Sequence, residues 1–172
     1  MNTLTNPVLK PSHVLVLLAI LNVIVIAVMQ SFGQSLLPYN IVAFEFAGTP
    51  EQAHQMVNAW QENGVLDSVY FLIGFDYLFM LTYSAFLWLA CIQLSKYFQD
   101  KINTLIVVIA WLQPLAAILD AVENLALFKI VEGSHETHWP LLAAWCAGPK
   151  FAMAGVGLLT IAIGGVRVWL RK

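Results

Sequence analysis

Four long apolar stretches, separated by short polar segments, constrain this chain more than any other feature. The first reads VLVLLAILNVIVIAVM from position 14 to 29, and Asn22 is its only polar residue. The other three exceed the roughly 20 residues that a helix needs to cross a membrane. Hydrophobic residues make up 60% of the chain and charged residues only 10%, whereas a soluble domain has about 25% charged residues. So much apolar surface cannot be hidden in a water-facing globule, which predicts an integral membrane protein.

We therefore predict an all-α integral membrane fold, a four-transmembrane-helix bundle that forms a single membrane domain over residues 1–172. The expected spanning helices cover about residues 12–36, 65–97, 102–131 and 140–170. The first stretch also loosely fits a signal peptide. Its length and the lack of an A-x-A cleavage motif favour a spanning helix.

A short amphipathic helix is predicted between the first and second spanning helices, over about residues 50–63. Thr49 is a good N-cap, Pro50 suits the first helical position, and Gln52 completes a capping box. Apolar residues then recur at i, i+3, i+4 and i+7, which are Ala53, Met56, Val57 and Trp60. This segment is too short and too polar to span, so we expect it to lie in the membrane interface.

Lysine and arginine are distributed unequally between the two predicted sides of the membrane. One side carries Lys10, Lys96, Lys101, Arg167, Arg171 and Lys172, and the other carries only Lys129. The positive-inside rule then puts both termini in the cytoplasm. We expect a multi-pass protein of a bacterial inner membrane, with the lipid bilayer as a partner. The net charge of −2 predicts no nucleic-acid partner.

Four charged residues lie deep inside the apolar stretches: Asp76, Asp120, Glu123 and Lys150. Each is 8 to 11 residues from the predicted outer end of its helix. At 1.5 Å per residue this corresponds to roughly 12–17 Å below the outer surface. Three helices thus bring charge to one level. Charge inside a membrane is costly, so the pattern indicates a functional site, although a buried ion pair that only fixes helix packing is the alternative.

Helical spacing groups further polar residues with these charges. Asp120, Glu123 and Asn124 share one helix face, since they are three and four residues apart. Tyr83 follows Asp76 by seven residues and lies on the same face. We therefore expect an outward-facing polar pocket lined by the second, third and fourth spanning helices.

The charges in this pocket do not balance. Three acids face one lysine, so we expect Lys150 to bridge Asp76 and Asp120, and at least one carboxyl to hold a proton or a cation. Glu45 lies in an apolar stretch (IVAFEFAG). It could reach into the pocket or face the headgroups, and the sequence leaves both open.

The sequence names no cofactor, and we predict no metal site. His135 and His138 have a metal-like spacing, but no HExxH motif or cysteine pair accompanies them. We expect them, like His54, to be solvated at the membrane interface. Lys150 already supplies positive charge at the level of the buried acids, which argues against a tight metal site there.

Several short motifs resemble a pattern found in uncharacterised bacterial four-helix integral membrane proteins. They span about residues 41–151 and are Phe44-Glu45-Phe46-Ala47-Gly48-Thr49-Pro50-Glu51, Asp76-Tyr77-Leu78-Phe79, Asp120-Ala121-Val122-Glu123-Asn124-Leu125 and Lys150-Phe151. The architecture is also similar to EXPERA-type membrane bundles, a group that includes sterol isomerases and sterol-binding receptors. That likeness implies a compact bundle whose acidic residues face an internal cavity, and it implies no activity by itself.

Three functions fit these observations. The first is binding of a small amphiphile or a cation, with Asp76, Asn124, Lys150, Glu45 and Tyr83 as binding residues. The alternative is an intramembrane enzyme acting on a lipid or isoprenoid, with Asp120 and Glu123 as a general acid/base pair. The third is a proton-coupled transport subunit. Four helices are few for a carrier, so transport would require a homo-oligomer.

Overall fold

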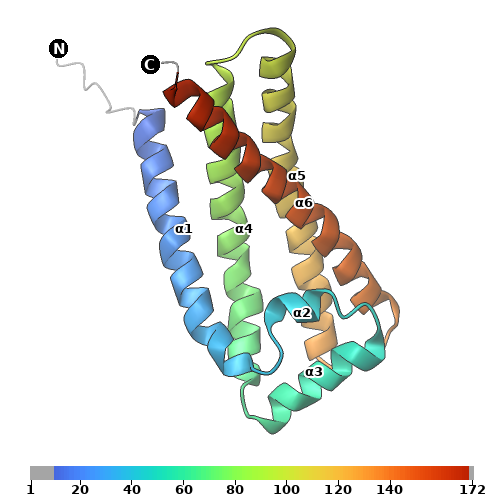
Figure 1. Cartoon of the computed structure of the whole chain (residues 1–172). Helices are drawn as coiled ribbons and strands as arrows, with labels where there is room; N and C mark the ends of the chain where they lie inside the picture. The colour runs from blue at the N-terminus through green and yellow to red at the C-terminus, as the bar shows by residue number, and fades with distance from the viewer. Residues whose placement is uncertain (1–9, 171–172) are drawn as a thin grey trace, which may run out of the picture.

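The structure is a computed structural model that describes residues 10–170, and Figure 1 shows a bundle of helices. Four helices are long and apolar enough to cross a membrane. They are α1 (Pro11–Gly33, extended by the 3-10 turn η1, Gln34–Leu36), α4 (Leu66–Ser95), α5 (Asp100–Val131) and α6 (His138–Trp169). No strand occurs among the described residues. The prediction of an all-helical fold with four long apolar helices is therefore confirmed.

Two short helices connect α1 to α4. The predicted amphipathic segment is α3 (Pro50–Glu62), and the Thr49 hydroxyl caps it by accepting a hydrogen bond from the Gln52 amide at 3.3 Å. Before it lies α2 (Ile41–Glu45), which the sequence analysis did not predict. Its five residues are too few to produce a helical period, and its main local signal is Asn40, whose side chain accepts a hydrogen bond from the Ala43 amide at 2.8 Å.

The two ends of the bundle are built differently (Figure 1). At one end lie the start of α1, the connection between α4 and α5, and the end of α6. At the other end α2 and α3 cross the bundle beside the connection between α5 and α6. Helices α4, α5 and α6 pack closely together, and α1 packs mainly against α4. Of the basic residues used to predict topology, Arg171 and Lys172 lie outside the described residues.

A buried aromatic pair attaches α2 and α3 to the bundle. The Trp60 side chain is fully buried, and its indole N–H donates to the Leu36 carbonyl at 2.9 Å. The Phe44 ring meets it edge-on, with 5.1 Å between ring centroids. These residues belong to an apolar core that also includes side chains of α4, α5 and α6. As a result, α2 is held in place as a cover over this end of the bundle, next to the buried charges.

Candidate functional site

Lys150 of α6 is the centre of a buried charge cluster. Its ammonium donates to Asp120 Oδ1 and to Glu123 Oε1, at 2.7 Å in each case. Glu45 Oε2 lies 3.6 Å from the same nitrogen. All four side chains are more than nine-tenths buried, so acids from α5 and α2 surround one lysine from α6.

Local sequence explains why these groups meet. Asp120 and Glu123 are three residues apart on α5, so one side chain from a neighbouring helix can reach both. On α6, Ala143 and Ala147 are fully buried. Such small residues let two helices approach closely, which brings Lys150 within hydrogen-bond distance of α5.

The expected bridge from Lys150 to Asp76 is wrong. Asp76 Oδ2 instead accepts a hydrogen bond from Asn124 Nδ2 at 2.6 Å, and Asp76 forms no ion pair among the described residues. The reason is geometric. Glu123 lies one turn from Asp120 and takes the second contact of the ammonium, whereas Asp76 approaches α5 from α4 and meets Asn124.

Tyr83 extends the cluster toward α4. Its hydroxyl donates to Asp120 Oδ2 at 3.0 Å, so the Asp120 carboxylate accepts from Lys150 on one oxygen and from Tyr83 on the other. The i+7 spacing from Asp76 placed Tyr83 on the correct face of α4, but the partner is Asp120 across the helix interface.

The structure places Glu45 in the cluster, which the sequence left open. Its Oε2 atom and that of Glu123 are buried and have no hydrogen-bond partner. Burial raises the pKa of Glu45, the Lys150 ammonium opposes this rise, and the Asp120 carboxylate adds to it. The site therefore holds four carboxyl groups and one lysine, which is one more acid than the sequence analysis counted.

A cavity of about 500 Å³ lies beside these charges. Its polar lining comes from Asn22, Glu45, Asp76, Tyr83, Asp120, Asn124 and Lys150. Its apolar lining comes from Ala19, Val23, Ile26, Met29, Ile41, Val42, Leu72, Ile73, Phe79, Phe86, Leu87, Phe151, Ala154 and Leu158. Glu123 is fully buried and is not among the lining residues, although it contacts Lys150.

The cavity differs from the predicted pocket in its walls and its opening. Helix α1 forms one wall, although the sequence analysis assigned the pocket to the other three long helices. Val23 on α1 and Leu158 on α6 are 66% and 56% exposed, so the cavity opens sideways between these helices. It was expected to open outward, but α2 covers that end and contributes Ile41, Val42 and Glu45 to the lining.

The histidines lie apart from this cavity. The His54 and His135 rings have centroids 4.4 Å apart, and His138 Nδ1 lies 3.2 Å from Glu136 Oε2 with both side chains more than half exposed. Within residues 10–170, no group of three or more His, Cys, Asp and Glu side chains is arranged to hold a metal ion.

Comparisons of the chain with protein-family models, with curated proteins and with solved structures found no match. The resemblance to EXPERA-type bundles stays a prediction from the sequence.

Proposed function

We propose that this chain is a multi-pass protein of a bacterial inner membrane that binds a small amphiphile between its helices. Four helices of sufficient length and apolarity support the membrane location. The start of α1, the connection between α4 and α5 and the end of α6 lie at one end of the bundle (Figure 1), and these elements carry Lys10, Lys96, Lys101 and Arg167. Lys129 is in the last turn of α5, which lies at the other end. By the positive-inside rule, the end with more basic residues, which holds the start of α1 and the end of α6, faces the cytoplasm.

One observation carries the binding function: the cavity combines long apolar walls with a cluster of charged and hydrogen-bonding groups. Pockets for small molecules are mostly apolar and contain a few polar groups that fix the ligand's orientation. An amphiphile matches this division, with its chain against the α1, α4 and α6 side chains and its polar group beside Asp76 and Asp120.

The sideways opening suits a ligand that is dissolved in the bilayer. Val23 and Ile26 on α1, and Phe151 and Leu158 on α6, line the cavity and are also exposed. These side chains would face lipid tails in a membrane. A single-chain amphiphile could enter between α1 and α6 without leaving the hydrocarbon region.

Binding can be tested with a pair of matched tryptophan variants on α6. Ala154 lines the cavity, whereas Ala152 is exposed and does not line it. In lipid nanodiscs, we expect saturable binding of at least one radiolabelled 12-carbon probe among dodecanol, dodecylamine and dodecanoate. Ala154→Trp should weaken that binding at least tenfold, and Ala152→Trp should not change it. The absence of saturable binding to the wild type, or equal effects of both variants, would contradict the proposal.

A second candidate, an intramembrane enzyme acting on a lipid or isoprenoid, is favoured by one specific observation. Asp120 lines the cavity while it accepts hydrogen bonds from both Lys150 and Tyr83, and Asp76 lines the same cavity. Two carboxyl groups in different surroundings suit acid/base chemistry. Because Glu123 is fully buried and does not line the cavity, Asp76 is a better partner for Asp120 than Glu123 is.

The enzyme candidate predicts that a lipid or isoprenoid is chemically converted while it is bound. Mass spectrometry of lipids incubated with the protein in nanodiscs would detect the product. Asp76→Asn should abolish turnover while saturable binding of dodecanol persists. If a bound lipid is recovered unchanged over many hours, this second candidate fails and the binding proposal stands.

A further inference from the structure

We propose that the polar group of the bound amphiphile is a single ammonium cation and that Asp76 holds it. This inference rests on the proposed function and specifies the chemistry of its ligand. Three independent features of the cavity carry it: an acid without a basic partner, a buried carboxyl oxygen without a hydrogen bond, and a set of aromatic rings.

The first feature is the imbalance between acids and bases. The Lys150 ammonium is within 2.7 Å of both Asp120 and Glu123. Asp76 has the neutral Asn124 amide as its hydrogen-bond partner and no basic side chain paired with it in the described part of the chain. A carboxylate in poorly solvated surroundings is stable only when its charge is compensated. A cation brought by the ligand would supply that compensation.

The second feature is the unpartnered oxygen of Glu45. This side chain is 7% exposed, lines the same cavity, and its Oε2 atom forms no hydrogen bond. The distance of 3.6 Å to Lys150 Nζ is too long for a hydrogen bond. An ammonium group carries several N–H donors, so it can satisfy an oxygen on α2 as well as the carboxylate on α4.

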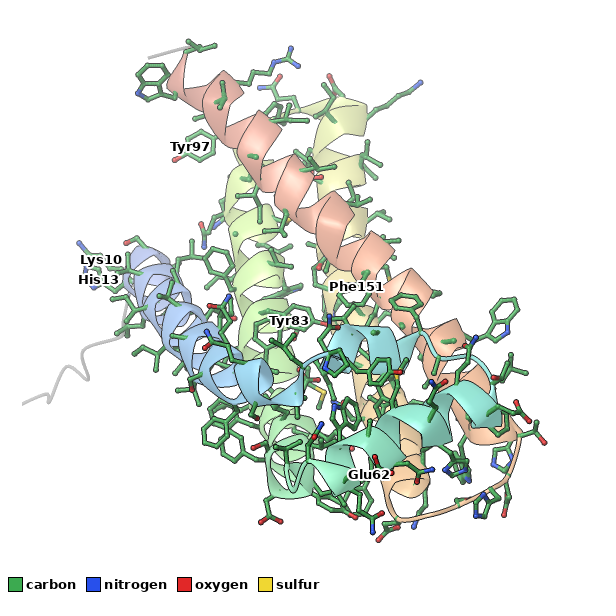
Figure 2. The ribbon with its side chains drawn as sticks, turned by 60° about the horizontal axis from the view of Figure 1, so that its bottom comes forward. Lys10, His13, Glu62, Tyr83, Tyr97 and Phe151 are labelled. Carbon is green, nitrogen blue, oxygen red and sulfur yellow. The ribbon has the colours of Figure 1, made fainter. Side chains whose placement is uncertain are left out.

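The third feature is the aromatic lining. Phe79, Tyr83 and Phe86 occur at i, i+4 and i+7 on α4 and all line the cavity, as does Phe151 on α6. Figure 2 shows the labelled Tyr83 and Phe151 close to the level of α2, where Glu45 ends that helix. Aromatic faces attract ammonium groups. The Phe151 ring already lies 5.0 Å from Lys150 Nζ, so the three rings of α4 are the ones that can hold the ligand's cation and the first part of its chain.

The alternatives fit less well. An anionic headgroup would be repelled by the surplus carboxylates, because like charges repel each other strongly where water is scarce. A neutral hydroxyl would leave Asp76 to neutralise its charge by binding a proton, whereas an ammonium compensates the carboxylate directly. A small water-soluble amine would match the acids but would leave the apolar walls without a partner.

The experiment compares probes of equal chain length in the same nanodiscs. We expect wild-type protein to bind dodecylamine at least tenfold more tightly than dodecanol, with dodecanoate the weakest of the three. Butylamine, which keeps the ammonium and lacks the long chain, should bind far more weakly than dodecylamine. The Asp76→Asn variant should bind dodecylamine at least tenfold more weakly than the wild type and so lose the preference for it. Asp67→Asn, the same change at an exposed site on α4, is the matched control and should bind like the wild type.

The outcomes separate this inference from the proposed function. If dodecanol or dodecanoate binds as tightly as dodecylamine, the ammonium inference is overturned while amphiphile binding stands. If no probe binds saturably, the proposed function itself fails. If butylamine binds as tightly as dodecylamine, the ligand is a small amine and the amphiphile is excluded. The wild-type probe order decides the matter even if Asp76→Asn does not fold, which circular dichroism would reveal.

Discussion

Two buried polar layers connect α5 to α6, and they differ in a way that separates packing from function. In the first, the Gln113 side chain is fully buried and its amide nitrogen donates to the carbonyls of Ile109 and Met153, at 3.1 Å each. In the second, Lys150 meets Asp120 and Glu123. The first layer is neutral and does not line the cavity beside the charges, whereas the second has surplus acids and faces that cavity.

Burial of a polar group does not by itself mark a site, as these two layers show. A neutral amide that donates to backbone carbonyls of two helices joins those helices. Gln113 Oε1, like Glu45 Oε2, is buried without a hydrogen-bond partner, but the amide is neutral and needs no counter-charge. Gly157 fits against Gln113 and leaves no space beside it. Around Lys150, by contrast, the acids outnumber the one lysine and lie beside the cavity. Helix packing alone explains neither the surplus acids nor the cavity.

The largest expected effect is that of Lys150→Met. Without the ammonium, Asp120 and Glu123 remain buried beside each other with no basic partner. Removing one member of a buried ion pair costs about 3–5 kcal/mol, so the free energy of unfolding should fall by about that amount. Thermal and denaturant unfolding in nanodiscs would measure the change.

Lys129→Met provides the matched control for this variant. Lys129 pairs with Glu132 at 2.8 Å, but both side chains are more than 40% exposed. Exposed pairs contribute about 0–1 kcal/mol. If both lysine variants lose the same stability, the buried cluster is not the stabilising centre that the geometry indicates.

The next effect tests the neutral layer. A Cβ atom at Gly157 would lie 2.7 Å from Gln113 Nε2, so Gly157→Ala should displace that side chain and weaken its bond to Met153. We expect a loss of about 1–3 kcal/mol with unchanged binding of 12-carbon probes. Gly155→Ala, where nothing lies within 4 Å, should be neutral. Impaired probe binding in Gly157→Ala would show that the two layers are not independent.

A smaller effect is expected for Tyr83→Phe, which removes one hydrogen bond to Asp120 and keeps the ring. The cost should be about 1 kcal/mol, typical of a single hydrogen bond, because Asp120 retains Lys150. Tyr97→Phe, at a site that is 60% exposed, serves as the control. A loss for Tyr83→Phe as large as that for Lys150→Met would mean that the hydroxyl, and not the ammonium, organises the cluster.

The sequence was sufficient to predict the long helices and the level of the charges. Apolar runs locate spanning helices because helix length must match membrane thickness. Counting from the outer ends put Asp76, Asp120, Glu123 and Lys150 at one depth, and the structure brings the last three into contact. The depth of a residue does not determine the direction in which its side chain points. For this reason we predicted that Lys150 contacts Asp76, whereas in the structure it contacts Glu123.

The remaining features depend on tertiary contacts that leave little trace in the sequence. The first apolar run has no periodic polar face that would indicate a cavity wall on α1. Asn22 is the only polar residue in this run, and its Oδ1 accepts a hydrogen bond from the Thr82 hydroxyl at 3.2 Å. Helix α2 is too short for a pattern, and Glu45 reaches Lys150 only because Phe44 and Trp60 hold that helix in place.

The smallest effect at neutral pH is expected for Glu45→Gln, because Lys150 keeps two closer acids. The effect on pH dependence should be clear. Burial raises the pKa of Glu45 above its ordinary value of 4.5, so the folded protein holds this proton more firmly than the unfolded chain does. At pH values between the ordinary pKa and the raised pKa, the folded state binds more protons than the unfolded state does. The free energy of unfolding must therefore fall as pH rises through this range.

Glu45→Gln has no proton to lose at this position, so its stability should decline less than that of the wild type as pH rises from 4.5 through the raised pKa. Unfolding measured at several pH values for both proteins isolates Glu45, since the other acids of the cluster are present in each. Glu62→Gln is the matched control, because Glu62 ends α3 at an exposed site that Figure 2 labels. Parallel curves for the wild type and Glu45→Gln would mean that α2 does not bury this carboxyl against the cluster, and the cavity would then lack its cover at this end of the bundle.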